Sequence, residues 1–132
     1  MHVVFDTNVL LSSTLWDGSV AQKLLFKLIK NDVKIFTSEA ILSEFSSVLK
    51  RDFGYSEKET LDIMGKVVLF ANLVTPIEKL DVVRDDPDDN RVIECAIASY
   101  SDYLITYDKH LLKVKSFRKI KIITPEVAFG LI

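Results

Sequence analysis

Short apolar runs alternate along this chain with longer segments in which apolar residues recur every three or four positions. The first run, Val3–Phe5, is β-branched and aromatic, which predicts a strand buried on both faces. Similar runs predict four further short strands, at Val33–Phe36, Leu73–Thr75, Tyr103–Thr106 and Ile120–Ile123.

Helical periodicity fills the segments between these runs. From Val20 to about Lys30, leucine and isoleucine residues occupy one face and lysines the other, which predicts an amphipathic helix. Thr37 or Ser38 is expected to cap a helix that runs to about Lys50. Three later helices are expected to begin at the capping box Ser56-x-x-Glu59, at an Asp86 N-cap with Pro87 in the first helical position, and at Thr124-Pro125-Glu126.

Strands separated by helices favour a parallel sheet covered on both faces. We therefore expect an α/β fold, a three-layer sandwich with a central, mainly parallel sheet flanked by helices. No linker, repeat or low-complexity segment divides the chain, so residues 1–132 are expected to form a single domain.

Composition narrows the class of protein. Of the residues, 48% are hydrophobic and 27% charged, as in ordinary globular proteins, and no apolar run approaches a membrane span. The amino terminus lacks the basic and apolar regions of a secretory signal, so the expected location is the cytoplasm. A lone cysteine, Cys95, rules out an internal disulfide and a thiolate metal centre.

Charge is unevenly distributed. The net charge of −2 gives no general electrostatic reason for nucleic-acid binding. However, residues 109–121 carry six basic side chains and no acid, whereas residues 81–89 carry five aspartates and one arginine. This separation indicates an acidic pocket beside a basic surface, although two unrelated solvated faces would give the same pattern.

Acids follow two of the predicted strands. Asp6 comes directly after Val3–Phe5, and Asp108 follows the strand that ends at Thr106. Ligands of open α/β sheets bind beyond the carboxyl ends of strands, so both acids stand where such folds carry out chemistry. Thr106 can hydrogen-bond a neighbouring carboxylate. Asp108 can also serve as the N-cap of a short helix after it, and the two roles are compatible.

Two helices can bring further acids to the same edge. Glu44 falls on the border of the apolar stripe of its helix and can lean toward the sheet, although a position at the solvated rim is the simpler interpretation. In the run of Asp85, Asp86, Asp88 and Asp89, one or two acids are explained as helix caps. Asp89 shares the inward stripe of its helix, Asp88 lies a quarter turn away, and Glu94 projects from nearly the opposite side.

Asp6, Glu44, Asp89 and Asp108 thus form a candidate all-oxygen cluster. Carboxylates held this close repel one another unless a cation neutralises them. Oxygen ligands without histidine or cysteine favour Mg²⁺ or Mn²⁺, which can activate water and stabilise an in-line phosphoryl displacement. His2 and His110 have no ligand partner at a suitable spacing and are expected to be structural or substrate-facing.

In this order, these motifs resemble PIN-domain ribonucleases, and most of all the small single-domain PIN proteins that act as toxins of toxin–antitoxin pairs. The resembling segments are Asp6-Thr7-Asn8, a helical Glu44, the run Asp86-Pro87-Asp88-Asp89-Asn90, and Thr106-Tyr107-Asp108. The resemblance implies Mg²⁺- or Mn²⁺-dependent cleavage of RNA. It also implies metal binding by the four acids, with supporting polar roles for Asn8 and Thr106.

The third acid departs from the family pattern, because many members carry a lone aspartate where this chain offers four. The resemblance further implies a homodimer and an antitoxin protein that blocks the site. Lys109, Lys113 and Lys115 are candidates for holding the RNA backbone, which predicts salt-sensitive binding. The lysine stripe on the helix that begins near Val20 is expected to be a solvated face.

Two other functions remain open from the sequence. A non-catalytic PIN-like module would bind RNA or protein, although modules that have lost cleavage usually lose acids and this chain keeps all four. A phosphatase or phosphoacceptor would use a strand-end aspartate such as Asp6. Haloacid-dehalogenase-like phosphatases place a second aspartate two residues later, where this chain has Asn8.

Overall fold

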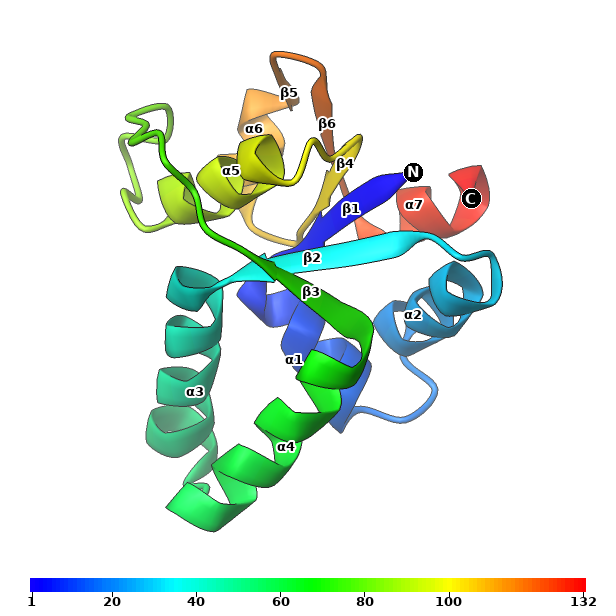
Figure 1. Ribbon diagram of the computed structural model, residues 1–132, viewed down its shortest axis with the longest axis vertical. Helices are drawn as coiled ribbons and strands as arrows, with labels where there is room; N and C mark the ends of the chain where they lie inside the picture. The colour runs from blue at the N-terminus through cyan, green and yellow to red at the C-terminus, as the bar shows by residue number, and fades with distance from the viewer.

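The computed structural model describes residues 1–132 and contains six strands and seven helices (Figure 1). The strands are β1 (His2–Phe5), β2 (Lys34–Ser38), β3 (Ala71–Val74), β4 (Tyr103–Ile105), β5 (Ser116–Phe117) and β6 (Ile120–Ile123). The helices are α1 (Thr7–Leu15), α2 (Val20–Lys30), α3 (Glu39–Phe53), α4 (Glu57–Phe70), α5 (Asp89–Ala98), α6 (Lys109–Val114) and α7 (Pro125–Leu131). None of the helices is both long and apolar enough to cross a membrane.

All the strands belong to one sheet, in the order β3-β2-β1-β4-β6-β5. Neighbouring strands are parallel except β5 and β6, which are antiparallel. The expected α/β fold with a mainly parallel sheet is therefore confirmed. Strand β5 was not predicted, because two residues are too short to show a hydrophobic pattern.

The helices cover the sheet in two layers (Figure 1). On one face α1 contacts α2, α3 and α4, and α2 contacts α7. On the other face α5 packs against β1, β2 and β4. The chain runs outward from β1 through β2 to β3, and α5 then carries it back across the sheet to β4, on the other side of β1. The strand order thus reverses between β1 and β4, where open α/β sheets have their ligand crevice.

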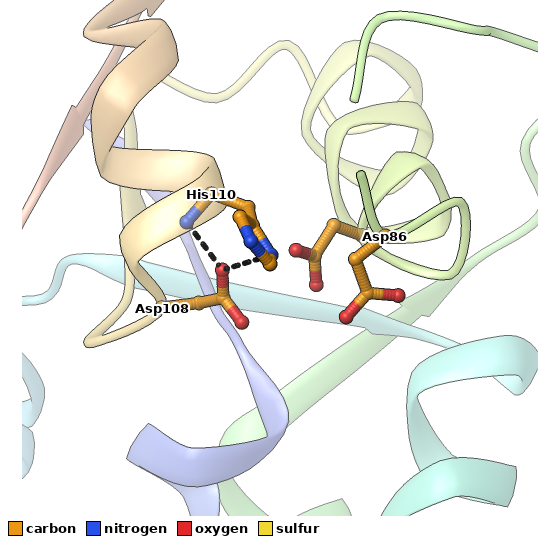
Figure 2. Close-up of side chains that lie close together, drawn as sticks. Asp86, Asp108 and His110 are labelled. Carbon is orange, nitrogen blue, oxygen red and sulfur yellow. Dashed lines mark hydrogen bonds and ion pairs between the residues drawn. The ribbon is translucent and has the colours of Figure 1, made fainter. Parts of the chain in front are cut away.

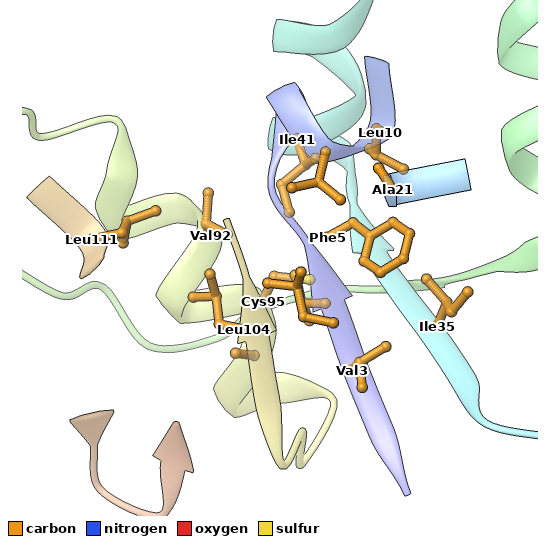
Figure 3. Packing of buried hydrophobic residues seen from close by; sticks show 14 of the residues in the cluster. Val3, Phe5, Leu10, Ala21, Ile35, Ile41, Val92, Cys95, Leu104 and Leu111 are labelled. Carbon is orange, nitrogen blue, oxygen red and sulfur yellow. The ribbon is translucent and has the colours of Figure 1, made fainter. Parts of the chain in front are cut away.

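The core is centred on β1. Val3, Val4 and Phe5 are completely buried, because successive residues of a strand face opposite sides and both sides of this sheet are covered. Figure 3 shows Phe5 turned toward Leu10 of α1, whereas Val92 of α5 lies on the other side of β1. A strand packed this tightly holds the residue that follows it in a fixed position.

Local sequence signals account for most helix starts. Ser38 caps α3, Ser56 and Glu59 form the predicted capping box of α4, and Thr124 caps α7. Helix α1 was not predicted. It is buried on several sides at Val9, Leu10, Leu11 and Ser13, so its sequence shows no alternation between an apolar and a polar face.

The start of α5 differs from the expectation. The helix begins at Asp89, and residues 86–88 form a turn in which the Asp86 carbonyl accepts a hydrogen bond from the Asp89 N–H. Asp86 is therefore not the N-cap, and Pro87 is not the first helical residue. The buried Asn90 side chain explains the difference, because it binds the backbone of Val83 and Pro87 and bends the chain into the turn.

Candidate active site

Asp6 lies at the point where the strand order reverses. It directly follows β1, and its N–H donates to the Ile105 carbonyl of β4. Its carboxylate accepts two hydrogen bonds, one at Oδ1 from the Thr7 N–H (2.7 Å) and one at Oδ2 from Thr106 Oγ1 (2.7 Å). Both carboxylate oxygens are thereby held in place beneath the crevice.

Asp108 is tied to Asp6 through Thr106, which is completely buried. Thr106 Oγ1 donates to Asp6 and accepts a hydrogen bond from the Asp108 N–H (2.9 Å). Asp108 Oδ1 accepts from the N–H groups of His110 (2.8 Å) and Leu111 (3.3 Å), so Asp108 also caps α6. One buried hydroxyl therefore fixes the relative position of the two acids.

Asp89 is the first residue of α5, which covers the face of the sheet opposite to α1. It is only 7% exposed, and its Oδ2 is buried without any hydrogen-bond partner. Burial raises the pKa of Asp89, and the nearby charges of Asp108, Asp6 and Asp86 raise it further. Buried carboxylates are normally hydrogen-bonded or ion-paired, so an unpaired carboxylate oxygen here suits a cation ligand.

Glu44 and Asn8 lie at the exposed rim. Glu44 Oε2 accepts a hydrogen bond from Thr7 Oγ1 (3.1 Å), so the exposed side chain both lies at the rim and leans from α3 toward the end of β1. Asn8 is exposed in the first turn of α1, next to Thr7. The structure therefore brings all four predicted acids to the same edge of the sheet, with two buried and two more accessible.

The buried acids carry an electrostatic penalty. Burial raises the pKa of Asp6 to about 6, against the hydrogen bonds from Thr106 and Thr7, and the charges of Glu44 and Asp108 add to the rise. Asp6 and Asp89 therefore resist ionisation on their own. A divalent cation would offset this penalty, and the all-oxygen donors fit a hard ion such as Mg²⁺ or Mn²⁺.

Three residues depart from what the sequence indicated. His110 and Asp86 join Asp89 and Asp108 in a group whose ligand atoms all lie within 4.8 Å of one another (Figure 2). This grouping could not be read from the residue pattern, because Asp86 and His110 are far apart along the chain. Glu94 was expected to point away from the core but is 6% exposed, since the segment before α5 crosses over it and Leu80 donates its N–H to Glu94.

Two clefts flank the acids. Between α3 and α5, a cleft of about 400 Å³ is lined by Glu44 and Asp88 together with the basic residues Arg51 and Arg91. On the other side, a cleft of about 280 Å³ is lined by residues of the acidic segment and of α6, His110 and Lys113 among them. The acidic and basic segments seen in the sequence thus meet at the site.

The lysines named as candidates for RNA contact are all exposed. Lys109 and Lys113 lie on α6, directly after Asp108, and Lys115 ends that helix. The lysine stripe on α2 lies elsewhere. There Lys27 Nζ donates to the Phe129 carbonyl of α7 (2.7 Å), which is a structural contact.

Comparison with known proteins identifies the family. Residues 2–110, which include all four acids, match the family model described as a PIN domain. The chain belongs to the PIN domain family. A similar sequence belongs to an uncharacterized protein of Methanocaldococcus jannaschii. It is 29% identical over 124 residues, which cover 90% of this chain and 78% of that protein.

Two solved structures share the fold of this PIN domain. The first is VapBC2 from Rickettsia felis bound to a DNA fragment from its promoter, with a TM-score of 0.69 and 15% identity over 94% of this chain and 98% of that one. The second is VapBC-1 from nontypeable Haemophilus influenzae, with a TM-score of 0.66 and 13% identity over 96% of this chain and 99% of that one. At identities this low, the structural likeness shows a common fold alone.

Proposed function

We propose that this PIN domain is an endoribonuclease that depends on Mg²⁺ or Mn²⁺ held by Asp6, Glu44, Asp89 and Asp108. One observation carries the proposal: Asp89 is buried beside Asp108 and Asp6, with an oxygen that has no hydrogen-bond partner. A structural acid would be paired or exposed. A carboxylate kept unpaired among other carboxylates is suited to a cation.

A divalent ion at these carboxylates would lower the pKa of a water molecule and neutralise the charge that develops on a phosphodiester during hydrolysis. The protein supplies fixed ligands and a proton acceptor. Asp6 is oriented by Thr7 and Thr106, and Asp108 by the start of α6. Glu44 is exposed, and only its Oε2 is hydrogen-bonded, so Oε1 is free to accept a proton from the attacking water.

The basic residues on either side of the acids support RNA as the substrate. Lys109, Lys113 and Lys115 would hold the backbone on the α6 side, while Arg51 and Arg91 would hold it in the cleft between α3 and α5. An extended strand laid across both surfaces would pass over the acids. Because phosphate contacts release counterions, its binding should weaken as salt is added.

The likeness to VapBC structures supports a more specific biological role. In this proposal the chain is the toxin of a toxin–antitoxin pair, acts in the cytoplasm as a homodimer, and is inhibited by an antitoxin protein that covers the acids. Exposed apolar residues on α4, at Leu61, Val68 and Leu69, provide surface for such contacts.

The test is cleavage of a mixed RNA pool by the purified protein. We expect fragments with Mg²⁺ or Mn²⁺, none with EDTA, and none from Asp6→Asn. Asp62→Asn, which alters an exposed acid of α4, should cleave like the unmodified protein. Identical RNA patterns under all conditions would rule out the nuclease. RNA retention without cleavage would instead favour a non-catalytic binding module.

A further inference from the structure

The group formed by Asp86, Asp89, Asp108 and His110 extends beyond the four acids of the proposed function. Its ligand atoms lie within 4.8 Å of one another and come from two separate elements. Asp86 lies in the turn before α5 and Asp89 is the first residue of that helix, whereas Asp108 is the N-cap of α6 and His110 lies in its first turn. Figure 2 shows Asp86 and Asp108 on either side of the His110 ring, in one small space.

A second observation indicates that this group faces a ligand. Asp89 is more than nine-tenths buried, and its Oδ2 has no partner, although the charge of Asp108 acts on it directly. The His110 ring makes no hydrogen bond. Its Nδ1 lies 3.8 Å from Asp108 Oδ1, which allows an ion pair when the ring is protonated but is too long for a hydrogen bond. A buried oxygen without a partner and an imidazole without a hydrogen bond therefore lie in the same group.

We propose that His110 and Asp86 complete a cation position with Asp89 and Asp108, and that its imidazole ligand makes it select Mn²⁺ and later transition-metal ions over Mg²⁺. The inference rests on the proposed function only in taking Asp89 and Asp108 as cation ligands. Mg²⁺ is bound almost entirely through oxygen, whereas the affinity of a site with nitrogen and oxygen ligands rises along the transition-metal series from Mn²⁺ through Co²⁺, and imidazole is a good ligand of Zn²⁺.

The distances suit a shared ion. Ligand atoms lie about 2 Å from such ions, so two ligands of one ion are at most about 4 Å apart. The separation of 3.8 Å between His110 and Asp108 falls within this limit. Ligand atoms of the group lie up to 4.8 Å apart, so a shared ion requires a small closing movement of the side chains. The His110 side chain is 45% exposed and has room to move.

The first test compares ion affinities by titration calorimetry. The unmodified protein should bind Mn²⁺ more tightly than Mg²⁺. His110→Gln should weaken Mn²⁺ binding by about 10-fold or more, since even residues that only orient metal ligands have effects of this size, and should leave Mg²⁺ binding nearly unchanged. Asp86→Asn should weaken the binding of both ions, whereas Asp85→Asn, at an exposed acid next to it, should weaken neither.

The second test detects the imidazole directly. The chain has two histidines, and His2 lies at the far end of β1 with Nδ1 2.7 Å from the Ser99 carbonyl, so it serves as an internal control. Adding Zn²⁺, which is diamagnetic, should shift one ring nitrogen of His110 in ¹⁵N nuclear magnetic resonance spectra and leave the His2 ring unchanged.

An unshifted His110 ring, or equal Mn²⁺ affinity before and after His110→Gln, would overturn the inference. Neither result depends on RNA cleavage, so the two proposals can fail separately. Cleavage that is unaffected by His110→Gln, with no ring shift, would leave the nuclease standing without this cation position. A ring shift in a protein that cleaves no RNA would leave the cation position standing without the nuclease.

Discussion

Two effects act in opposite directions on the pKa of Asp6, and the rise caused by burial is larger than the fall caused by hydrogen bonds. Thr7 and Thr106 each donate to it and favour the charged form, yet burial raises its pKa to about 6 from 3.8. Below pH 3.8 both the folded and the unfolded protein hold this carboxyl protonated. Between the two values only the unfolded protein ionises freely, so the metal-free folded protein loses stability as the pH rises.

Asp6→Asn should therefore stabilise the metal-free protein near neutral pH. A pKa difference of about two units corresponds to about 3 kcal/mol, which is an upper value because asparagine alters the hydrogen bonds. Urea unfolding in EDTA should show a gain over the unmodified protein that grows from near zero at pH 4 to its full size above pH 6. A gain that does not vary with pH would show that the charge of Asp6 is not its cause.

The Thr106 hydroxyl provides a second prediction at this scale. Thr106→Val keeps the shape but removes the donor to Asp6 and leaves the Asp108 N–H unpaired, so the protein should lose about 1–3 kcal/mol of unfolding free energy. Calorimetric titration should also show weaker Mn²⁺ binding.

Thr60→Val is the matched control. Thr60 is also buried, but its Oγ1 has no partner, so its loss should be neutral or stabilising. Equal destabilisation by the two substitutions would mean that the Thr106 hydroxyl has no special role.

At the scale of elements, the start of α5 depends on Asn90. Its Oδ1 accepts from the N–H groups of Val82 and Val83, and its Nδ2 donates to the carbonyls of Val83 and Pro87. These bonds hold in place the segment that carries Asp86, so the Asn90 side chain helps to position one of the acids near the site.

Asn90→Ala should loosen this segment and lower the free energy of unfolding by roughly 2–4 kcal/mol, since buried backbone groups lose their partners. Hydrogen exchange should then accelerate at the Val82 and Val83 amides. Asn31→Ala, at an exposed residue with one side-chain bond to Lys27, should change neither quantity appreciably. Unchanged protection of the two valine amides would contradict this role for Asn90.

Some of these elements and site residues can be predicted from the sequence alone, and others cannot. Strand ends and caps are local signals, so Asp6, Asp108 and the starts of α3, α4 and α7 were predictable. The turn before α5 and the burial of Glu94 were not, because both follow from contacts with the irregular segment after β3. The place of His110 in the group was also missed, because it depends on tertiary packing. Its neighbours in the group, Asp86 and Asp89, approach it only when α5 and α6 pack on the sheet.

Across the whole molecule, the proposed RNA path predicts where binding depends on salt. In an Asp6→Asn background, which should bind RNA without cutting it, replacing both Lys109 and Lys113 by alanine removes two phosphate contacts. The slope of log K against log salt concentration should become shallower by about 1.4. Replacing Lys23 and Lys30 of α2 should leave the slope unchanged, and an equal effect of both pairs would place RNA elsewhere.

Asp89 is a buried ligand of the proposed metal site, chosen among four neighbouring aspartates, and nuclease activity should depend on it most. The most direct measurement is the single-turnover rate of RNA cleavage in Mn²⁺ for Asp89→Asn, with the exposed Asp85→Asn as its control. We expect the rate to fall by more than about 100-fold for Asp89→Asn, because loss of a ligand should exceed the effect of residues that only orient one, and to be unchanged for Asp85→Asn. Cleavage by Asp89→Asn at the rate of the unmodified protein would contradict the account.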